Sequence, residues 1–405
     1  MNLFGVAEAE PLVAQLGGAR SESEARELFA RAAWSAIIEP GDRVAGIAIR
    51  SLGAPRALQA LIDQSGADEW AALLSSEEVS EDAATHALDR WKPRVDSRAM
   101  VRVLTQAQRV GARLLGPASP SWPQGLNDLG DHAPVALWVR GSDAALAATE
   151  RSIALVGARA ATGYGEHVAM DASAGLVDRN FAVVSGAAYG IDGMAHRAAL
   201  ASNGTTVAFL AGGVDRFYPS GHDALLTRIA ELGAVVAELP CGSAPTRWRF
   251  LQRNRLIAAA SSATVVLEAG QRSGSLNTAH HALQVGRPLG VVPGPVTSAA
   301  SAGCHRLLRE TTAVCVTTPD EMAALADPHE ENSTATASGG NDAGVVRLLD
   351  ALSERSPHPV SELAARTGLA IAEVQSLLGR LELEQSVAER DRGWVRRPSN
   401  PRTKR

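Results

Sequence analysis

Four arginines and two aromatic residues stand close together in the stretch TRWRFLQRNRLIAAASSATVV. The aromatic residues are Trp248 and Phe250, and the arginines lie within nine residues of one another: Arg247, Arg249, Arg253 and Arg255. The stretch contains no acidic residue. Guanidinium groups bind phosphate oxygens, and aromatic faces stack on nucleic-acid bases. The composition predicts a phosphate-binding surface, and an arginine-rich solvated loop is the alternative interpretation.

A first glycine loop, VGARAATGYGEHV, stands between an apolar run and a helical stretch and contains Arg159. Backbone N–H groups at the start of the following helix, together with Arg159, would bind a phosphate. The loop departs from GxGxxG, and no acidic residue follows the next strand to hold a ribose, so a dinucleotide cofactor is not expected. A glycine turn needed only for chain geometry is the alternative.

Two further loops have the same character. The segment SGAAYGIDGMAH offers Ser185, Gly186, Gly190 and Asp192 near a helix start. There Asp192 would cap the helix or hold a neighbouring arginine in place. The segment EAGQRSGSLNTA places Arg272 and then Ser273, Gly274 and Ser275 after an apolar run. Glycine and small hydroxyl residues allow close approach of backbone to a phosphate.

Catalytic patterns are missing from this sequence. It contains no nucleophile elbow, P-loop, paired carboxylates or cysteine–histidine cluster, and the neighbours Cys304 and His305 point in different directions along a chain. We therefore expect a binding protein rather than an enzyme, with no catalytic residue, no metal ligand and no cofactor.

The elements that carry these loops follow from the pattern of apolar runs. SIALVGA, FAVVSGA, TVAFLAG, GAVVAELP, ATVVLEA, PLGVVPG and AVCVTT are continuous, as in strands covered on both faces, and alanine-rich helical stretches separate them. Residues 116–325 are predicted to form a doubly wound, mostly parallel α/β sheet. Ligands of such sheets bind at the carboxyl ends of the strands, where the glycine loops fall.

Further segments flank the predicted sheet. Residues 1–115 have helical periodicity and predict a small helical domain of the SAM or helix-hairpin-helix kind. Residues 326–342 predict a flexible linker, and residues 343–398 predict a winged helix that ends in a short hairpin. The basic residues 399–405 are expected to be disordered.

Composition limits the class and compartment. The 405 residues are 45% hydrophobic, and the net charge of −5 is segregated, with 16 acids and 10 basic residues in the first hundred. Screening confines each charge to a range of roughly 8 Å, so an acidic end does not oppose phosphate binding elsewhere. Three cysteines without CxxC spacing, no signal-peptide pattern and no long apolar window lead us to expect a cytoplasmic protein without a membrane span.

Several motifs agree in order with one known family. The strings IALVGARAATGYG, VVSGAAYGIDGMAHRAAL, LAGGVDRFYP, FLQRNRLIAAAS, SGSLNTAHHAL and VPGPVTSAASAGCHRLLRE resemble the DNA-processing protein A family, DprA or Smf. The resemblance covers residues 20–325, and the carboxyl-terminal winged helix is similar to one that many members carry. It implies an extended Rossmann-like domain that binds single-stranded DNA, forms a homodimer, protects incoming DNA and loads a RecA-type recombinase during natural transformation.

The resemblance also implies site residues, position by position. Arg159 matches the arginine of the first loop. The other DNA-binding candidates are Ser185, Gly186, Gly190 and Asp192, then Arg253, Asn254 and Arg255, then Ser273, Gly274 and Ser275. Arg247 stands where relatives have a basic or polar residue. YPSGH departs from the family pattern because it lacks the asparagine usual after that proline.

Two other functions stay open at this level. Rossmann-like nucleotide phosphoribohydrolases have a similar outline and a catalytic glutamate, a role that Glu268 would have to take. Alternatively, the winged helix would read duplex DNA and make the chain a transcriptional regulator. Its second helix, IAEVQSLLGRLELEQ, has three glutamates and one arginine, which does not favour approach to a major groove.

Overall fold

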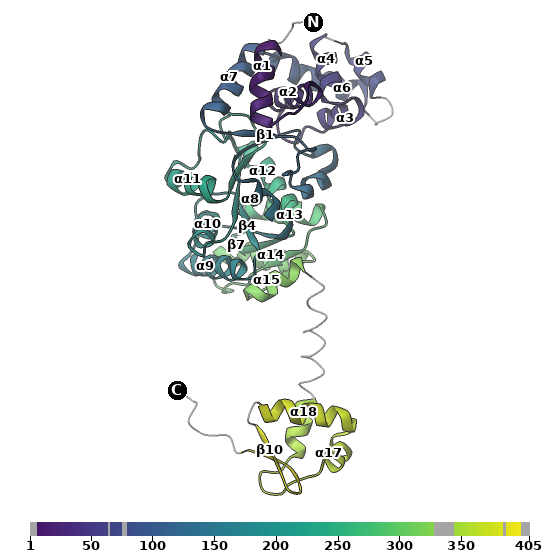
Figure 1. Cartoon of the computed structure of the whole chain (residues 1–405), viewed down its shortest axis with the longest axis vertical. Coiled ribbons are helices and arrows are strands. Elements are labelled where there is room, and N and C mark those ends of the chain that lie inside the picture. Colours follow the sequence, from purple (N-terminus) through teal and green to yellow (C-terminus); the bar gives the residue numbers. More distant parts are fainter. Residues whose placement is uncertain (1–5, 64, 75–78, 328–343, 384–385, 398–405) are drawn as a thin grey trace. The chain divides into compact units, whose positions relative to one another are not determined.

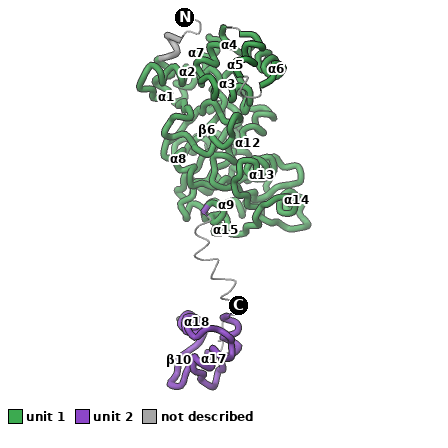
Figure 2. The backbone as a smooth tube through the Cα atoms, turned by 90° about the vertical axis from the view of Figure 1, so that its right-hand side faces the viewer, with its two compact units in different colours: residues 1–326 green, residues 327–405 purple. Residues whose placement is uncertain are grey.

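The computed structural model describes residues 6–63, 65–74, 79–327, 344–383 and 386–397. The chain divides into two compact units, residues 1–326 and 327–405 (Figure 2). The predicted linker beyond residue 327 and the predicted basic tail lie outside the described residues.

Helices make up the first part of the larger unit (Figure 1). Side-chain oxygens of Ser21, Asp42, Ser80 and Asp96 accept backbone N–H bonds and so fix four of the helix starts. The indole rings of Trp34 and Trp70 both pack edge-on against Trp91, with ring centroids 5.2 and 5.6 Å apart. The helices are α1 (Val6–Gly17), α2 (Glu22–Ile37), α3 (Arg43–Leu52), α4 (Ala54–Ile62), α5 (Ala67–Leu73), α6 (Glu81–Trp91) and α7 (Ser97–Arg109).

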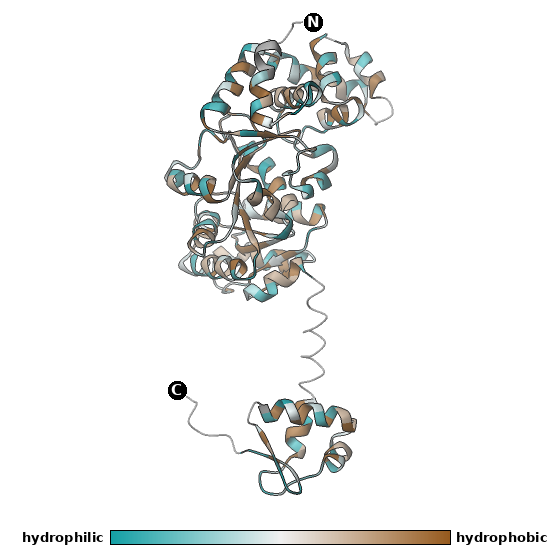
Figure 3. Ribbon diagram, viewed as in Figure 1, coloured by the Kyte–Doolittle hydropathy of each residue, from teal (hydrophilic) through white to brown (hydrophobic). Residues whose placement is uncertain are grey.

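A nine-stranded sheet forms the centre of the same unit, in the order β1-β2-β6-β5-β4-β3-β7-β8-β9. The strands from β6 to β9 in that order are parallel, and β1 and β2 add an antiparallel edge. Figure 3 shows the strands in the middle of the sheet mostly brown, because both faces are covered. The strands are β1 (Arg113–Leu115), β2 (Leu137–Gly141), β3 (Ser152–Gly157), β4 (Ala182–Ser185), β5 (Thr206–Leu210), β6 (Ala234–Ala237), β7 (Ala263–Glu268), β8 (Leu289–Val291) and β9 (Val314–Cys315).

Helices cover the sheet on both faces. On one face, α12 and α13 pack on alternate residues such as Val156 and Val266, and on the other face α9 and α10 pack on Leu155 and Leu267. The helices after β1 are α8 (Asp143–Ala147), α9 (Gly163–Asp178), α10 (Ile191–Ala201), α11 (Asp223–Leu232), α12 (Arg247–Ala260), α13 (Ser275–Gln284), α14 (Ala302–Glu310) and α15 (Pro319–Ala326).

The predicted fold class, an extended Rossmann-like α/β sheet with a winged helix, is confirmed. All seven apolar runs form strands, β3 to β9. The pattern of apolar runs does not predict the antiparallel strands β1 and β2, because both are short and β2 carries Arg140 near its end. The arginine-rich stretch is the 14-residue helix α12 and not a loop.

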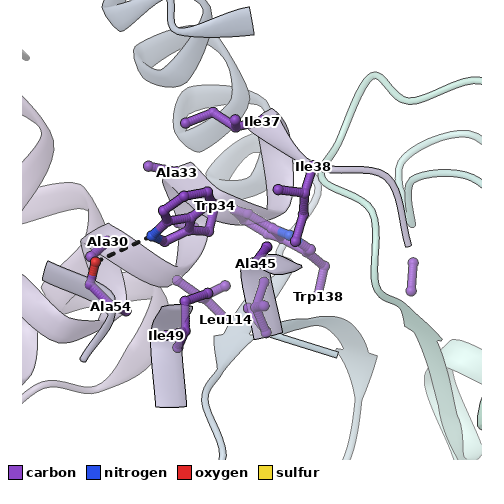
Figure 4. Close-up of a cluster of buried hydrophobic side chains, with 14 of the residues drawn as sticks. Ala30, Ala33, Trp34, Ile37, Ile38, Ala45, Ile49, Ala54, Leu114 and Trp138 are labelled. Carbon is purple, nitrogen blue, oxygen red and sulfur yellow. Dashed lines mark hydrogen bonds between the residues drawn. The ribbon is translucent and has the colours of Figure 1, made fainter. Parts of the chain in front are cut away.

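One hydrophobic core joins the amino-terminal helices to the sheet (Figure 4). Trp34 of α2 donates its indole N–H to the Ala54 carbonyl at 3.2 Å, and Trp138 of β2 donates to the Ser35 hydroxyl at 3.2 Å. Leu114 of β1 lies in the same cluster. This core contains residues from both sides of residue 115. The domain boundary predicted there stays a prediction.

The smaller unit has the winged-helix order that the sequence predicts. Residues 344–351 are helical, and α17 (Val360–Thr367), α18 (Ile371–Leu383) and the antiparallel hairpin β10 (Val387–Arg390) and β11 (Gly393–Arg396) follow.

Candidate nucleic-acid interface

The order of the sheet reverses beside β3, which pairs with β4 on one side and with β7 on the other. Such a switch point leaves a crevice at the carboxyl ends of the strands. A cavity of about 500 Å³ opens there, lined by Val156 and Gly157 at the end of β3, by the loop after β7 and by α12. It brings together seven of the residues that the sequence singles out: Arg159, Asp192, Arg253, Asn254, Ser273, Gly274 and Ser275.

Glu268 holds the first glycine loop in place. Its buried carboxylate accepts hydrogen bonds from the Thr162 backbone N–H at 2.9 Å and from the Thr162 hydroxyl at 2.5 Å. That hydroxyl in turn accepts the Gly165 N–H and caps α9. Glu268 does not line the cavity, whereas Arg159 in the same loop lines it and is exposed.

The second glycine loop lies next to the cavity. Ser185 is buried and donates to the Leu155 carbonyl at 2.6 Å, so its hydroxyl is used inside the fold. Gly190 has φ of 73°, and a Cβ there would stand 2.2 Å from the Ala158 carbonyl oxygen. Gly186 lies against the Arg253 guanidinium, which a Cβ would approach to 2.5 Å. Ser185, Gly186 and Gly190 therefore shape the loop rather than line the cavity.

Asp192 is buried at the start of α10. Burial raises its pKa, although the nearby charge of Arg253 and the backbone N–H groups of Ala188, Gly186 and Gly157 oppose that shift. These donors tie the carboxyl group to both glycine loops. Of the two roles that the sequence left open, a side-chain cap is not formed at the start of α10, and the attraction between Asp192 and Arg253 favours holding the arginine, while the hydrogen bonds of Asp192 hold the loops.

Arg253 and Asn254 extend from α12 under the cavity. Arg253 is 5% exposed, and its Nη1 donates to the carbonyls of Gly186 at 2.7 Å and Phe209 at 2.6 Å. Burial lowers the pKa of Arg253 to about 10, against the opposing charge of Asp192, so the guanidinium stays charged at neutral pH. Asn254 accepts from Arg253 Nε and donates to Gly274 and Asn277, which links α12 to the third loop.

Arg255 lies elsewhere, and its internal contacts do not favour the expected contact with DNA, which stays a prediction. Its guanidinium is 3% exposed and makes two hydrogen bonds, of 2.8 and 2.7 Å, to the buried carboxylate of Glu238. A third bond joins its Nε to the His132 carbonyl. Residues 253 and 255 are two apart on a helix, so they face different directions, and Arg255 does not line the cavity. Arg247 is exposed in the first turn of α12 and also lies outside the cavity lining.

Phe250 is the aromatic centre of the surface. The Arg159 guanidinium lies 4.8 Å from its ring centroid, that of Arg253 lies 5.8 Å away, and the Tyr218 ring lies at 5.6 Å. Tyr218 is about half exposed, at 49%, and so is Trp248, at 56%, which lies two residues before Phe250 on α12 and outside the cavity lining. The surface therefore offers aromatic faces beside fixed positive charge.

The third loop closes the other side of the cavity. Ser273 and Ser275 share a hydrogen bond of 2.7 Å between their hydroxyls at the amino end of α13. Thr278, one turn further, is 2% exposed and lines the cavity. Arg272 is exposed and lines it too, and it forms no ion pair with any residue that the structure describes.

Sequence reasoning names Arg272 and Phe250 but does not carry them, or Thr278, into the set of site residues. The signal for Arg272 is present, since the arginine stands in a glycine loop directly after a strand. Phe250 can be assigned only from the fold, because the helix brings Arg253 to it at a spacing of three residues and the tertiary structure brings Arg159 and Tyr218.

Nucleophiles and metal ligands do not gather here. Burial raises the pKa of the Cys304 thiol to about 11 and that of Cys241 to about 12, which keeps both protonated. Among the described residues, no group of three or more histidine, cysteine, aspartate or glutamate side chains is placed to hold a metal ion. No helix in the described ranges is both long and apolar enough to span a bilayer.

Comparison with known proteins assigns the family. The model of DNA recombination-mediator protein A matches residues 113–327, and the DprA winged helix domain matches residues 332–391. The DNA processing protein DprA of Mycobacterium tuberculosis is 46% identical over 301 residues, 71% of this chain and 77% of that protein. Protein Smf of Escherichia coli K12 is 35% identical over 272 residues, 65% of this chain and 72% of that protein.

A solved structure agrees with this assignment. The crystal structure of DprA from Streptococcus pneumoniae has a TM-score of 0.57 at 26% identity, and covers 73% of this chain and 95% of that chain. The matches confirm the resemblance that the motifs indicated: the chain belongs to the DprA/Smf family of DNA-processing proteins.

Proposed function

We propose that this protein binds single-stranded DNA across the carboxyl ends of β5, β4, β3 and β7. The observation that carries the proposal is the cavity at the switch point, where Arg159, Arg253 and Arg272 meet two glycine loops beside Phe250. Guanidinium groups and helix starts bind phosphates without regard to sequence, and exposed aromatic rings stack on unpaired bases. A duplex keeps its bases inside and offers no face to Tyr218 or Trp248.

The residues have separate roles in this proposal. Arg159 and Arg272 contact phosphates, because both are exposed and line the cavity. Ser273, Gly274 and Ser275 present the start of α13 to a phosphate. Arg253 acts from below through Nη2, while its Nη1 holds the second loop. Arg247, at the start of α12, contacts the DNA strand outside the cavity.

Beyond binding, we propose the family role: the protein protects incoming single strands and loads a RecA-type recombinase onto them in the cytoplasm, as a homodimer and without enzymatic turnover. Family membership supports this role. A strand-exchange assay would test it, in which the protein should relieve inhibition of the recombinase by single-strand-binding protein. Light scattering at micromolar concentration would test the dimer.

The geometry weighs against the phosphoribohydrolase alternative. Glu268 would be its catalytic carboxylate, yet both oxygens are bound by Thr162 and the side chain does not line the cavity. Incubation with nucleoside monophosphates and chromatography of the products would detect released base, and sustained turnover would favour that alternative.

The test of DNA binding is fluorescence anisotropy of labelled poly-dT and of a matched duplex at 50 and 200 mM salt. The wild type should prefer poly-dT. Each phosphate contact contributes about 0.7 to the log-log salt slope for a single strand, so R159A/R272A should lose about 1.4 units of slope. The ratio of the affinity at 50 mM salt to the affinity at 200 mM salt should then be about sevenfold smaller in R159A/R272A than in the wild type.

The matched control is R197A/R228A, which removes two exposed arginines from α10 and α11 outside the cavity lining. It should keep the wild-type slope. An equal slope in R159A/R272A and the wild type would show that the strand does not cross the cavity.

A further inference from the structure

The winged-helix unit has a core of its own, which fixes its surface. Leu348, Leu363, Val374, Leu377, Leu378, Leu381 and Val387 are buried together, so three helical segments and the hairpin pack as one body. The hairpin is also bound at its base, where His358 and Trp394 exchange two backbone hydrogen bonds of 2.8 and 3.0 Å. Side chains on β10 and β11 are therefore presented from a rigid support.

Helix α18 presents a surface that is unsuited to a major groove. Its described exposed side chains carry two negative charges, Glu373 and Glu382, against one positive charge, Arg380. Recognition helices approach base edges between two rows of phosphates, and α18 gathers no basic face for that approach: Glu373 and Arg380 share one side of the helix, and Glu382 lies on the opposite side. The helix that usually reads sequence in this fold brings no net positive charge from its described exposed side chains.

The hairpin has the opposite character. Within residues 387–397, four arginines are exposed against two acids, Glu389 and Asp391. None of the four forms an ion pair with a residue in the described part of the chain. The four arginines lie along one narrow hairpin, in its two-residue turn Asp391–Arg392 and at or beside the ends of its strands. They are Arg390, Arg392, Arg396 and Arg397.

The aromatic residue of the hairpin is not available for stacking. Trp394 is only partly exposed and packs against the core of the unit. Arginines without an exposed ring favour phosphates over unpaired bases, and duplex DNA has one phosphate charge per about 1.7 Å of its axis. This is the reverse of the cavity surface, where Phe250 and the half-exposed Tyr218 accompany the arginines.

We propose that the β10–β11 hairpin is a second nucleic-acid contact, which binds the phosphate backbone of duplex DNA without reading sequence, while α18 stays out of the groove. This goes beyond the single-strand surface and does not depend on it. A protein with both contacts would hold single-stranded DNA in one unit and an adjoining duplex in the other.

The test uses the full chain and a labelled blunt duplex, with anisotropy measured from 50 to 200 mM salt. Each duplex phosphate contact contributes about 0.9 to the salt slope, so R390A/R392A should reduce it by about 1.8 units. R347A/R355A is the matched control, since it removes two exposed arginines from the same unit outside the hairpin and should leave the slope unchanged. Circular dichroism melting should be equal in both variants.

Two further measurements separate the hairpin from α18. Q375E/S376E adds two acids to the exposed face of the helix and should change duplex affinity less than twofold, and AT-rich and GC-rich duplexes should bind within threefold of each other. An unchanged slope in R390A/R392A, an equal loss in R347A/R355A or a tenfold loss in Q375E/S376E would each overturn the proposal. Binding of poly-dT is measured in parallel. If the wild type did not bind poly-dT, only the proposed single-strand function would be refuted.

Discussion

Arg249 in the first turn of α12 forms a two-point ion pair with Glu39, which follows α2. The Nε atom lies 2.9 Å from Oε2 and Nη2 lies 2.8 Å from Oε1 of the carboxylate, and Arg94 contacts the same group at 2.9 Å. The next residue along α12, Phe250, faces the cavity. The amino-terminal helices thus hold the helix that supports the proposed DNA surface.

Glu39→Gln should weaken this attachment. Loss of a charged, partly buried hydrogen-bond pair is expected to lower the free energy of unfolding by about 1–2 kcal/mol and to reduce poly-dT affinity severalfold, because α12 is less firmly placed. Urea unfolding and anisotropy measure the two effects. Glu22→Gln is the control, since Glu22 pairs with Arg26 at an exposed site on α2 and should change neither quantity.

The same pair predicts a pH dependence. Partial burial raises the pKa of Glu39, but the hydrogen bonds and charges of Arg249 and Arg94 outweigh it, so the pKa lies below its ordinary 4.5. A lowered pKa stabilises the fold above pH 4.5 and loses that contribution as pH falls through the folded-state value. The stability difference between the wild type and E39Q should therefore be constant near pH 7 and shrink below pH 4.5; a difference that grows on acidification would contradict this assignment.

Arg255 and Arg159 should respond differently to substitution. Arg255→Ala leaves Glu238 buried without a partner and should cost about 3–5 kcal/mol of stability, whereas E238L/R255M should recover most of it. Arg159→Ala changes an exposed residue and should alter stability by less than about 0.5 kcal/mol, yet lower the poly-dT salt slope by about 0.7. If R159A were the destabilised variant and R255A only changed the slope, Arg255 would be the phosphate contact and Arg159 the structural residue.

Stacking should be separable from charge at Tyr218 and Trp248. Base–aromatic stacking contributes about 1–3 kcal/mol per base, so Y218A and W248A should each weaken poly-dT binding by roughly five- to a hundredfold with an unchanged salt slope. Leu232→Ala, at an equally exposed apolar residue at the end of α11, should bind like the wild type. Equal effects of all three substitutions on poly-dT binding would argue against stacking.

Alanine substitution should have different effects at Gly190 and Gly274, because only Gly190 has a positive φ, which favours glycine. Gly190 has φ of 73° and lies against the Ala158 carbonyl, so Gly190→Ala should lower stability by about 2 kcal/mol or more and disturb the cavity. Gly274 has φ of −65°, and a Cβ there would meet no other atom within 4 Å, so Gly274→Ala should keep stability. It should still reduce poly-dT affinity, because its methyl group occupies the approach of a phosphate to α13. Thermal melting and anisotropy on both variants distinguish these effects.

Local patterns determined much of the architecture from the sequence alone. Continuous apolar runs such as residues 153–157 and 263–267 form buried parallel strands because a strand covered on both faces needs apolar side chains at every position. Glycine at or just after the ends of β3, β4, β5, β7 and β8 marked the loops, and the parallel topology placed those loops at one edge. The family followed from the same motifs, and the winged helix from its own helix spacing.

Tertiary structure alone decided which charges face a ligand. The sequence shows Arg249, Arg253 and Arg255 as equals, but in the fold Glu39 binds the first, two carbonyls bind the second and Glu238 binds the third. Those partners are 17 to 210 positions away along the chain, at separations that no local pattern encodes. Arg159 and Arg272, isolated in the sequence, are therefore the principal candidates for phosphate contact, because both are exposed at the cavity, whereas Arg253 has two carbonyl acceptors inside the fold.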